Sequence, residues 1–142
     1  MLLKKGVDAR ARAQSGATAL MFVNDRGNSR IVELLIGAGA DIHGADQDGN
    51  SVLMFMAKYG LTDAVKILLR HKAQVNAGNR GGFTALMAAA YSDRPEVIET
   101  LLRHGAAAEL PDQAGKTALA WAWEKECGAR TLSLLDAAGT GK

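Results

Sequence analysis

Gly82-Phe83-Thr84-Ala85-Leu86-Met87-Ala88-Ala89-Ala90, residues 82–90 of this chain, holds the pattern that decides its fold. A glycine, a hydroxyl residue two places later and a leucine four places later recur at one constant step on either side of it. The glycines are Gly16, Gly49, Gly82 and Gly115, the hydroxyl residues are Thr18, Ser51, Thr84 and Thr117, and the leucines are Leu20, Leu53, Leu86 and Leu119. Agreement of three positions in one register indicates an internal repeat.

Each repeating unit predicts two short helices joined by a turn. The hydroxyl oxygen can accept a hydrogen bond from the free N–H groups at a helix start, and the alanine-rich run after Thr84 favours helix. Gly27 and Gly60 then interrupt the chain. Apolar residues such as Val65 and Leu68 follow at helical spacing, which predicts a second helix.

The ends of the units are also marked by sequence. Gly39 and Gly105 suit the left-handed backbone that follows a helix. Lys72 stands at the equivalent position between them, where that conformation costs a side chain about 1–2 kcal/mol. The segments 47–50 and 80–82 are rich in Gly, Asn and Asp and predict tight turns.

A two-helix unit of this length cannot bury its apolar face alone, so neighbouring units must stack. We therefore expect an all-α solenoid of stacked helix-turn-helix units with hairpin-like loops, forming one domain over residues 1–142. Its expected parts are a partial N-terminal unit at 1–13, repeats at 14–46, 47–79 and 80–112, and a C-terminal capping repeat at 113–142.

The repeated unit resembles the ankyrin repeat family, whose pattern runs through Thr-Pro-Leu-His, a pair of alanines, an apolar helix and Gly-Ala-Asp. Residues 82–90 and 39–41 are the clearest matches. The family proline is replaced by Ala19, Val52, Ala85 and Ala118, and the family histidine by Met21, Met54, Met87 and Ala120. Methionine exchanges a polar tie for a soft apolar side chain, which predicts a looser turn network. The resemblance implies a curved stack whose first helices line a concave side that usually binds proteins.

Composition narrows the class of protein. Hydrophobic residues make up 48% of the chain and charged residues 23%, as in a folded soluble protein. No apolar run reaches the roughly 20 residues of a membrane span, and no secretory signal is visible. The single cysteine, Cys127, fits a reducing compartment, so we expect a cytoplasmic protein. A net charge of +2 is too small to indicate nucleic acid.

Several residues could belong to a catalytic, phosphate-binding, metal or nucleic-acid site, but each lacks the neighbouring residues that such a site needs. Cys127 has no histidine near it in its unit, and the turn at 114–117 lacks the upstream glycine of a phosphate loop. His71 and His104 occupy equivalent positions without a third ligand. The basic cluster of Lys4, Lys5, Arg10 and Arg12 lacks interleaved aromatic residues and is interpreted as solvated surface. We expect no catalytic residue, cofactor or metal.

The predicted partner-binding residues are those that vary inside the repeated frame. They are Gln47, Asp48, Asn50, Tyr59, Arg80, Phe83, Tyr91, Ser92, Lys116 and Trp123. Tyr, Phe and Arg are residue types that anchor interfaces. Phe83 is the sharpest candidate, because an aromatic residue expected at an exposed turn tip has little structural reason to be there. Trp123 has a second interpretation, in which it covers the open end of the stack together with Trp121.

The sequence thus predicts a non-enzymatic protein–protein interaction module that binds a partner protein through its concave face and loop tips. The alternative is a regulatory or scaffolding segment of a larger multidomain protein or enzyme. Only about one helical turn precedes Gly6, so the first full repeat is poorly covered. This predicts either an upstream segment or self-association through the incomplete N-terminal end.

Overall fold

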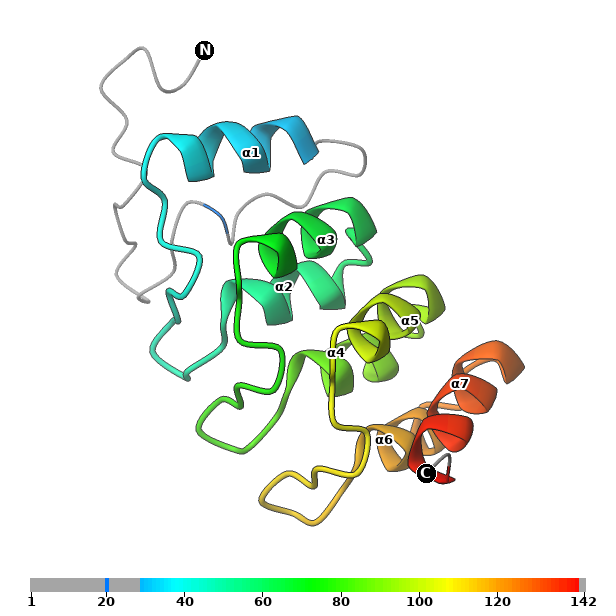
Figure 1. The fold of residues 1–142 in the computed structure, drawn as a ribbon. Helices are drawn as coiled ribbons and strands as arrows, with labels where there is room; N and C mark the ends of the chain where they lie inside the picture. The colour runs from blue at the N-terminus through cyan, green and yellow to red at the C-terminus, as the bar shows by residue number, and fades with distance from the viewer. Residues whose placement is uncertain (1–19, 21–28, 141–142) are drawn as a thin grey trace.

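The computed structural model describes residue 20 and residues 29–140, and these form α-helices joined by loops (Figure 1). The helices are α1 (Ser29–Gly37), α2 (Val52–Lys58), α3 (Thr62–Arg70), α4 (Ala85–Tyr91), α5 (Pro95–Arg103), α6 (Ala118–Glu124) and α7 (Ala129–Thr140). Within this described part no strand is formed beyond two isolated β-bridges, Ala45 with Ser51 and Gly78 with Thr84. The predicted all-α class is confirmed.

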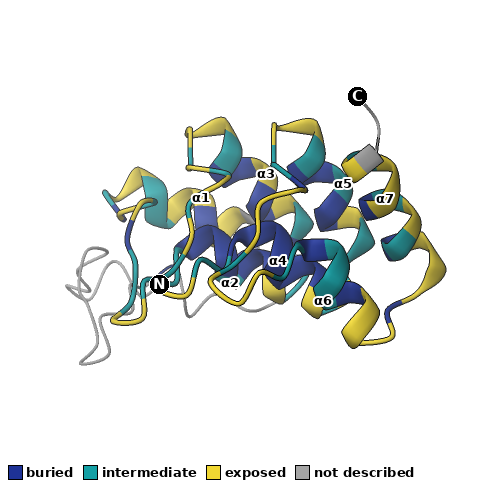
Figure 2. Ribbon diagram, turned by 90° about the horizontal axis from the view of Figure 1, so that it is seen from below, coloured by how far each residue is buried: buried dark blue, intermediate teal, exposed yellow. Residues whose placement is uncertain are grey.

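The helices lie in two layers. We call α2, α4 and α6 the inner helices, which pack side by side, and α1, α3, α5 and α7 the outer helices, which do the same behind them (Figures 1 and 2). The inner helices begin one repeat apart, at Val52, Ala85 and Ala118. The loops before them project from one side of the stack like a row of hairpins (Figure 1). This is the predicted solenoid.

The core lies where the two layers face each other (Figure 2). Leu20, Leu53 and Leu86, one repeat apart, are all buried, whereas their equivalent Leu119 is half-buried. Full burial of each such side chain stabilises the fold by about 1.5–3 kcal/mol. The run from Ala88 to Ala90 is buried too, and its small side chains let the neighbouring helices approach closely.

The hydroxyl residues cap the inner helices as predicted. The side-chain oxygens of Ser51, Thr84 and Thr117 accept hydrogen bonds from backbone N–H groups three residues later, at 3.2, 3.3 and 3.3 Å. The prediction that methionine loses the polar tie at these turns is wrong. The sulfur atoms of Met54 and Met87 each lie 3.4 Å from the backbone nitrogen of the capping residue. A thioether is a weak hydrogen-bond acceptor, so a weak hydrogen bond remains at this position.

Left-handed backbone recurs with the repeat. Gly39 and Gly105 have φ angles of 97° and 91°, and Lys72 between them has 67°, as their sequence positions predict. A second set follows the inner helices: Gly60 at 71°, Asp93 at 55° and Glu126 at 53°. The sequence predicted a break at Gly60 but left-handed backbone at none of these three positions, and at Asp93 and Glu126 no glycine signals this conformation.

The hairpin-like loops are built alike and bonded to one another. In each loop an Asp or Asn, at positions 46, 79 and 112, accepts hydrogen bonds from the N–H groups two and four residues later. The N–H of Arg80 donates to the carbonyl of Asp48 at 3.0 Å, and the N–H of Gln113 donates to that of Gly81 at 2.8 Å. The loops therefore form a ladder along the stack.

Several predictions fall outside the residues that the structure describes. They are the partial unit at 1–13 with its proposed self-association, the basic cluster of Lys4, Lys5, Arg10 and Arg12, and the roles of Gly16, Thr18 and Gly27.

Candidate partner-binding groove

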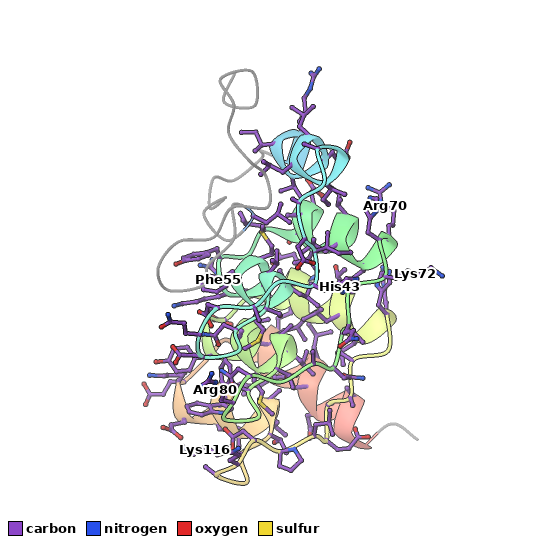
Figure 3. The ribbon with its side chains drawn as sticks, turned by 90° about the vertical axis from the view of Figure 1, so that its left-hand side faces the viewer. His43, Phe55, Arg70, Lys72, Arg80 and Lys116 are labelled. Atoms are coloured by element: carbon purple, nitrogen blue, oxygen red, sulfur yellow. The ribbon has the colours of Figure 1, made fainter. Side chains whose placement is uncertain are left out.

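A hollow lies across the inner helices α2 and α4, and we call it the inner groove. The repeat places Phe55, Ala88 and Trp121 at equivalent positions in successive units. Ala88 is small between two aromatic residues, and a space of about 290 Å³ is left beside it. The residues that line this groove are Asn50, Met54, Phe55, Lys58, Phe83, Ala88, Tyr91 and Ser92. Phe55 lies on the opposite side of the stack from Arg70 and Lys72 (Figure 3).

Three aromatic rings form a cluster at one wall of the inner groove. The ring centroids of Phe83 and Trp121 lie 5.6 Å apart, those of Tyr91 and Trp121 5.6 Å, and those of Phe83 and Tyr91 6.5 Å. All three pairs meet edge to face, the arrangement that aromatic quadrupoles favour. The prediction that Phe83 stands exposed at a turn tip without structural reason is wrong, because Phe83 is half-buried in this cluster.

Lysine side chains lie over the aromatic rings. The Lys125 ammonium is 4.3 Å from the ring centroid of Tyr91, and the Lys116 ammonium is 4.4 Å from that of Trp121. Lys58 lies 5.7 Å from the ring of Tyr59. Cations at these distances are attracted by the ring faces. Lys116 also forms an ion pair with Glu124, whereas Lys58 and Lys125 form none with a described residue.

Trp121 is held in place by the loop that precedes its helix. Its indole N–H donates to a carboxylate oxygen of Asp112 at 2.9 Å. The backbone N–H of Lys116 is the main reason that the pKa of Asp112 is lowered; partial desolvation opposes this, and the Trp121 indole adds to it. The ionised carboxylate thus accepts hydrogen bonds from both the loop and the aromatic cluster.

A family model described as Ankyrin repeats (3 copies) matches this chain over residues 1–79, 20–112 and 75–138. The chain belongs to the ankyrin repeat family. Ankyrin repeats are generally protein–protein interaction modules and are typically non-enzymatic. No curated protein matches the chain.

The predicted binding residues take different places in this ankyrin stack. Asn50, Phe83, Tyr91 and Ser92 line the inner groove, and Lys116 lies beside it over Trp121. Gln47, Asp48 and Arg80 are exposed on the loops. Arg80 and Lys116 lie along the same side of the stack as Phe55 (Figure 3).

Tyr59 and Trp123, the two remaining predicted binding residues, belong neither to the groove lining nor to the loops. Tyr59 is half-buried and packs against the core. Trp123 is 63% exposed on α6 and occupies the position that the buried Ala57 and Ala90 fill in the preceding repeats. Trp121, which was expected to share its role, belongs instead to the aromatic cluster.

Met54, Phe55 and Ala88 line the groove but were not among the predicted binding residues. The signal that could have found them is the comparison of equivalent positions in the ankyrin repeats. Phe55, Ala88 and Trp121 alternate between large and small along the stack, whereas the nearby position of Leu53, Leu86 and Leu119 keeps one residue type. A small residue between two large ones indicates a hollow.

Cys127 and His104, the residue types most often found in catalytic or metal sites, have hydrogen-bond partners in the helices. The Cys127 thiol is buried and donates to the carbonyl of Ala90 at 3.0 Å, and desolvation raises the pKa of this thiol, with the charge of Asp93 adding to the effect. A ring nitrogen of His104 lies 2.8 Å from the carbonyl of Thr100. Across the described residues, histidine, cysteine and acidic side chains do not gather in threes as a metal site would require. None of the helices that the structure describes has the length and apolarity to cross a bilayer.

Proposed function

We propose that this chain is a non-enzymatic protein-binding module whose inner groove and neighbouring loop tips hold a segment of a partner protein. The observation that carries the proposal is the half-exposed aromatic wall of Phe83, Tyr91 and Trp121 beside the hollow at Ala88. Tyr91 is 41% exposed, although a ring of this size is favourable to bury. Aromatic residues next to a concave apolar surface are typical anchors of protein interfaces.

The groove is supported by rigid structure. Its walls come from two packed helices, and Phe83 follows a loop whose geometry Asn79 fixes by accepting hydrogen bonds from Gly81 and Phe83 at 2.9 and 3.0 Å. Side chains already held in place lose little further conformational freedom when a partner binds. This arrangement favours binding without rearrangement of the module.

The test uses a partner isolated on the full chain and two variants of the groove. Ala88→Leu fills the hollow, and Tyr91→Ala removes the exposed ring. We expect each to weaken partner binding about tenfold or more, as loss of an interface anchor does. Ala137→Leu adds the same atoms to an exposed position of α7 and is the matched control. Affinity measured by titration calorimetry that is unchanged in both groove variants would place the binding site elsewhere.

The urea unfolding curve of Ala88→Leu shows whether the larger side chain disturbs the core. A core residue that forces the structure to shift lowers the free energy of unfolding by about 1–3 kcal/mol. Tyr91→Ala changes an exposed ring and keeps the helix, so a loss of binding in this variant with normal unfolding reports on the groove alone.

A further inference from the structure

We propose that the segment held in the inner groove is an acidic peptide that carries one apolar anchor residue. This inference rests on the proposed function and names the chemistry of the partner.

The apolar part of the proposal follows from the floor and walls of the groove. Met54, Phe55, Phe83 and Ala88 present thioether, aromatic and methyl groups to the hollow. The space of about 290 Å³ is at the small end of the pockets that bind ligands, so one large apolar side chain fills it rather than a whole helix face. The peptide therefore inserts a residue such as Leu, Met or Phe.

The acidic part follows from the charges around that hollow. Lys58 lines the groove, Lys125 lies over the Tyr91 ring that also lines it, and neither forms an ion pair with a described residue. None of the described residues that line the groove is acidic. Three nearby carboxylates have partners: Glu124 pairs with Lys116, Asp112 accepts hydrogen bonds from Trp121 and its own loop, and Asp46 accepts one from the side chain of Asn50. Within the part of the chain that the structure describes, two ammonium groups thus remain for carboxylates of a partner. Complementary charge of this kind confers specificity and speeds encounter.

A single-stranded nucleic acid could also be drawn to lysines and aromatic rings, because bases stack on open ring faces. The geometry favours a peptide. The Lys116 ammonium covers a face of Trp121 at 4.4 Å, and the Lys125 ammonium covers a face of Tyr91 at 4.3 Å. The three rings also pack edge to face against one another, which leaves no row of parallel faces for successive bases.

The experiment selects displayed random dodecapeptides on the full chain and measures the enriched sequences as fluorescein-labelled synthetic peptides. We expect the enriched peptides to carry two or more Asp or Glu residues beside Leu, Met, Phe or Trp. Lys58→Glu and Lys125→Glu should each lower the affinity for these peptides about fivefold or more, because a weak attraction between charges is replaced by repulsion. Lys66→Glu, an exposed lysine on the outer helix α3, is the matched control and should leave binding unchanged.

A charge exchange makes the test specific. The peptide with its acidic residues changed to lysine should bind the Lys58→Glu/Lys125→Glu double variant more tightly than it binds the unmodified chain. Raising the salt concentration from about 0.05 M to about 0.5 M should weaken binding of the acidic peptide, because the electrostatic screening length shortens to a few ångströms.

The outcomes separate this inference from the proposed function. Enriched peptides that are neutral or basic, and are lost in Ala88→Leu, would overturn the acidic partner while the groove stays a protein-binding site. Peptides unaffected by Ala88→Leu and Tyr91→Ala would overturn both. A labelled oligo-uridine that binds more tightly than every peptide, or a selection that enriches none, would overturn the peptide partner.

Discussion

The carboxylate of Asp93 accepts a hydrogen bond from the hydroxyl of Thr131 at 2.6 Å, so a residue of one repeat holds the outer helix of the next. The backbone N–H of Gly128, directly before α7, lies 3.3 Å from the same carboxylate. Gly128 has no side chain to cap its own helix, and Asp93 takes this role across the repeat interface. The adjacent Arg94 reaches the other way, with its Nε donating to the carbonyl of Lys58 at the end of α2. The turn between α4 and α5 thus joins three repeats.

Replacing Asp93 with glycine should weaken the last repeat. Gly60 stands at the equivalent position one repeat earlier with a similar φ, so Asp93→Gly fits the backbone. It removes the cap and relieves a small strain, because Asp adopts left-handed backbone more readily than most side-chain-bearing residues. Loss of a helix cap and its partners, offset in part by this relief, predicts a free energy of unfolding lower by about 1 kcal/mol, measured in urea. Hydrogen exchange should speed up in α7 before α3. Glu109→Ala, at an exposed loop position, is the control. Equal stability of Asp93→Gly and the control would contradict capping between repeats.

Two glycines of the loop ladder should respond differently to alanine. Gly82 and Gly115 have nearly the same φ, 78° and 82°, so Gly→Ala costs about 1–2 kcal/mol at each from backbone strain. A Cβ at Gly82 would also lie 3.2 Å from the Cα of Asp112 in the next loop, whereas one at Gly115 meets nothing within 4 Å. Gly82→Ala should therefore lose clearly more stability than Gly115→Ala in chemical denaturation. Equal losses would show that contact between the loops adds nothing.

Lys72 is the residue whose replacement by glycine should stabilise the chain. Its φ of 67° strains a side chain, while Gly39 and Gly105 take the same conformation freely. Relief of about 1–2 kcal/mol, reduced by the greater entropy of glycine in the unfolded chain, predicts a net gain of about 0.5–1 kcal/mol for Lys72→Gly. Lys72→Ala removes the same charge but keeps the strained Cβ, and its stability should stay near that of the original chain. A loss of stability in Lys72→Gly would refute the strain.

Asp112 should contribute to the acid sensitivity of the fold. The N–H of Lys116 is the main cause that holds the pKa of this carboxyl below its ordinary value of 3.8. A pKa lowered by folding gives stability that is present above the unfolded-state pKa and is lost as the pH falls through the folded-state pKa. Asp112→Asn should therefore show a smaller drop of its thermal midpoint between about pH 5 and pH 2. The two chains having parallel acid profiles would argue against this role.

The fold could be predicted closely from the sequence because its main features depend on short stretches of chain. Glycines one repeat apart, hydroxyl caps such as Thr84 and a left-handed Lys72 each depend on a few neighbouring residues, so their conformations follow from residue type. The binding groove depends on pairs of repeats. The hollow exists because Ala88 is smaller than its equivalents Phe55 and Trp121, and Phe83 is covered by rings from α4 and α6.

Two further features of the structure were not predicted, one between repeats and one within them. Nothing near Asp93 in sequence shows that its carboxylate caps α7, since Thr131 belongs to the following repeat. The sulfur contacts of Met54 and Met87 were missed because methionine is usually treated as purely apolar. The sequence signal for the contact between repeats is a difference at equivalent positions, with Asp93 standing where the preceding repeat has Gly60.

Methionine-methyl NMR of the full chain gives the most direct measurement of whether the inner groove holds the partner. Both Met54 and Met56 are buried, but Met54 forms part of the groove floor, whereas Met56 on the same helix does not line the groove and serves as an internal reference. With methyl-labelled methionine and a saturating partner, the account predicts a shift of the Met54 signal, assigned by Met54→Leu, and an unmoved Met56 signal. A partner that binds at full affinity and leaves the Met54 methyl signal unchanged would contradict it.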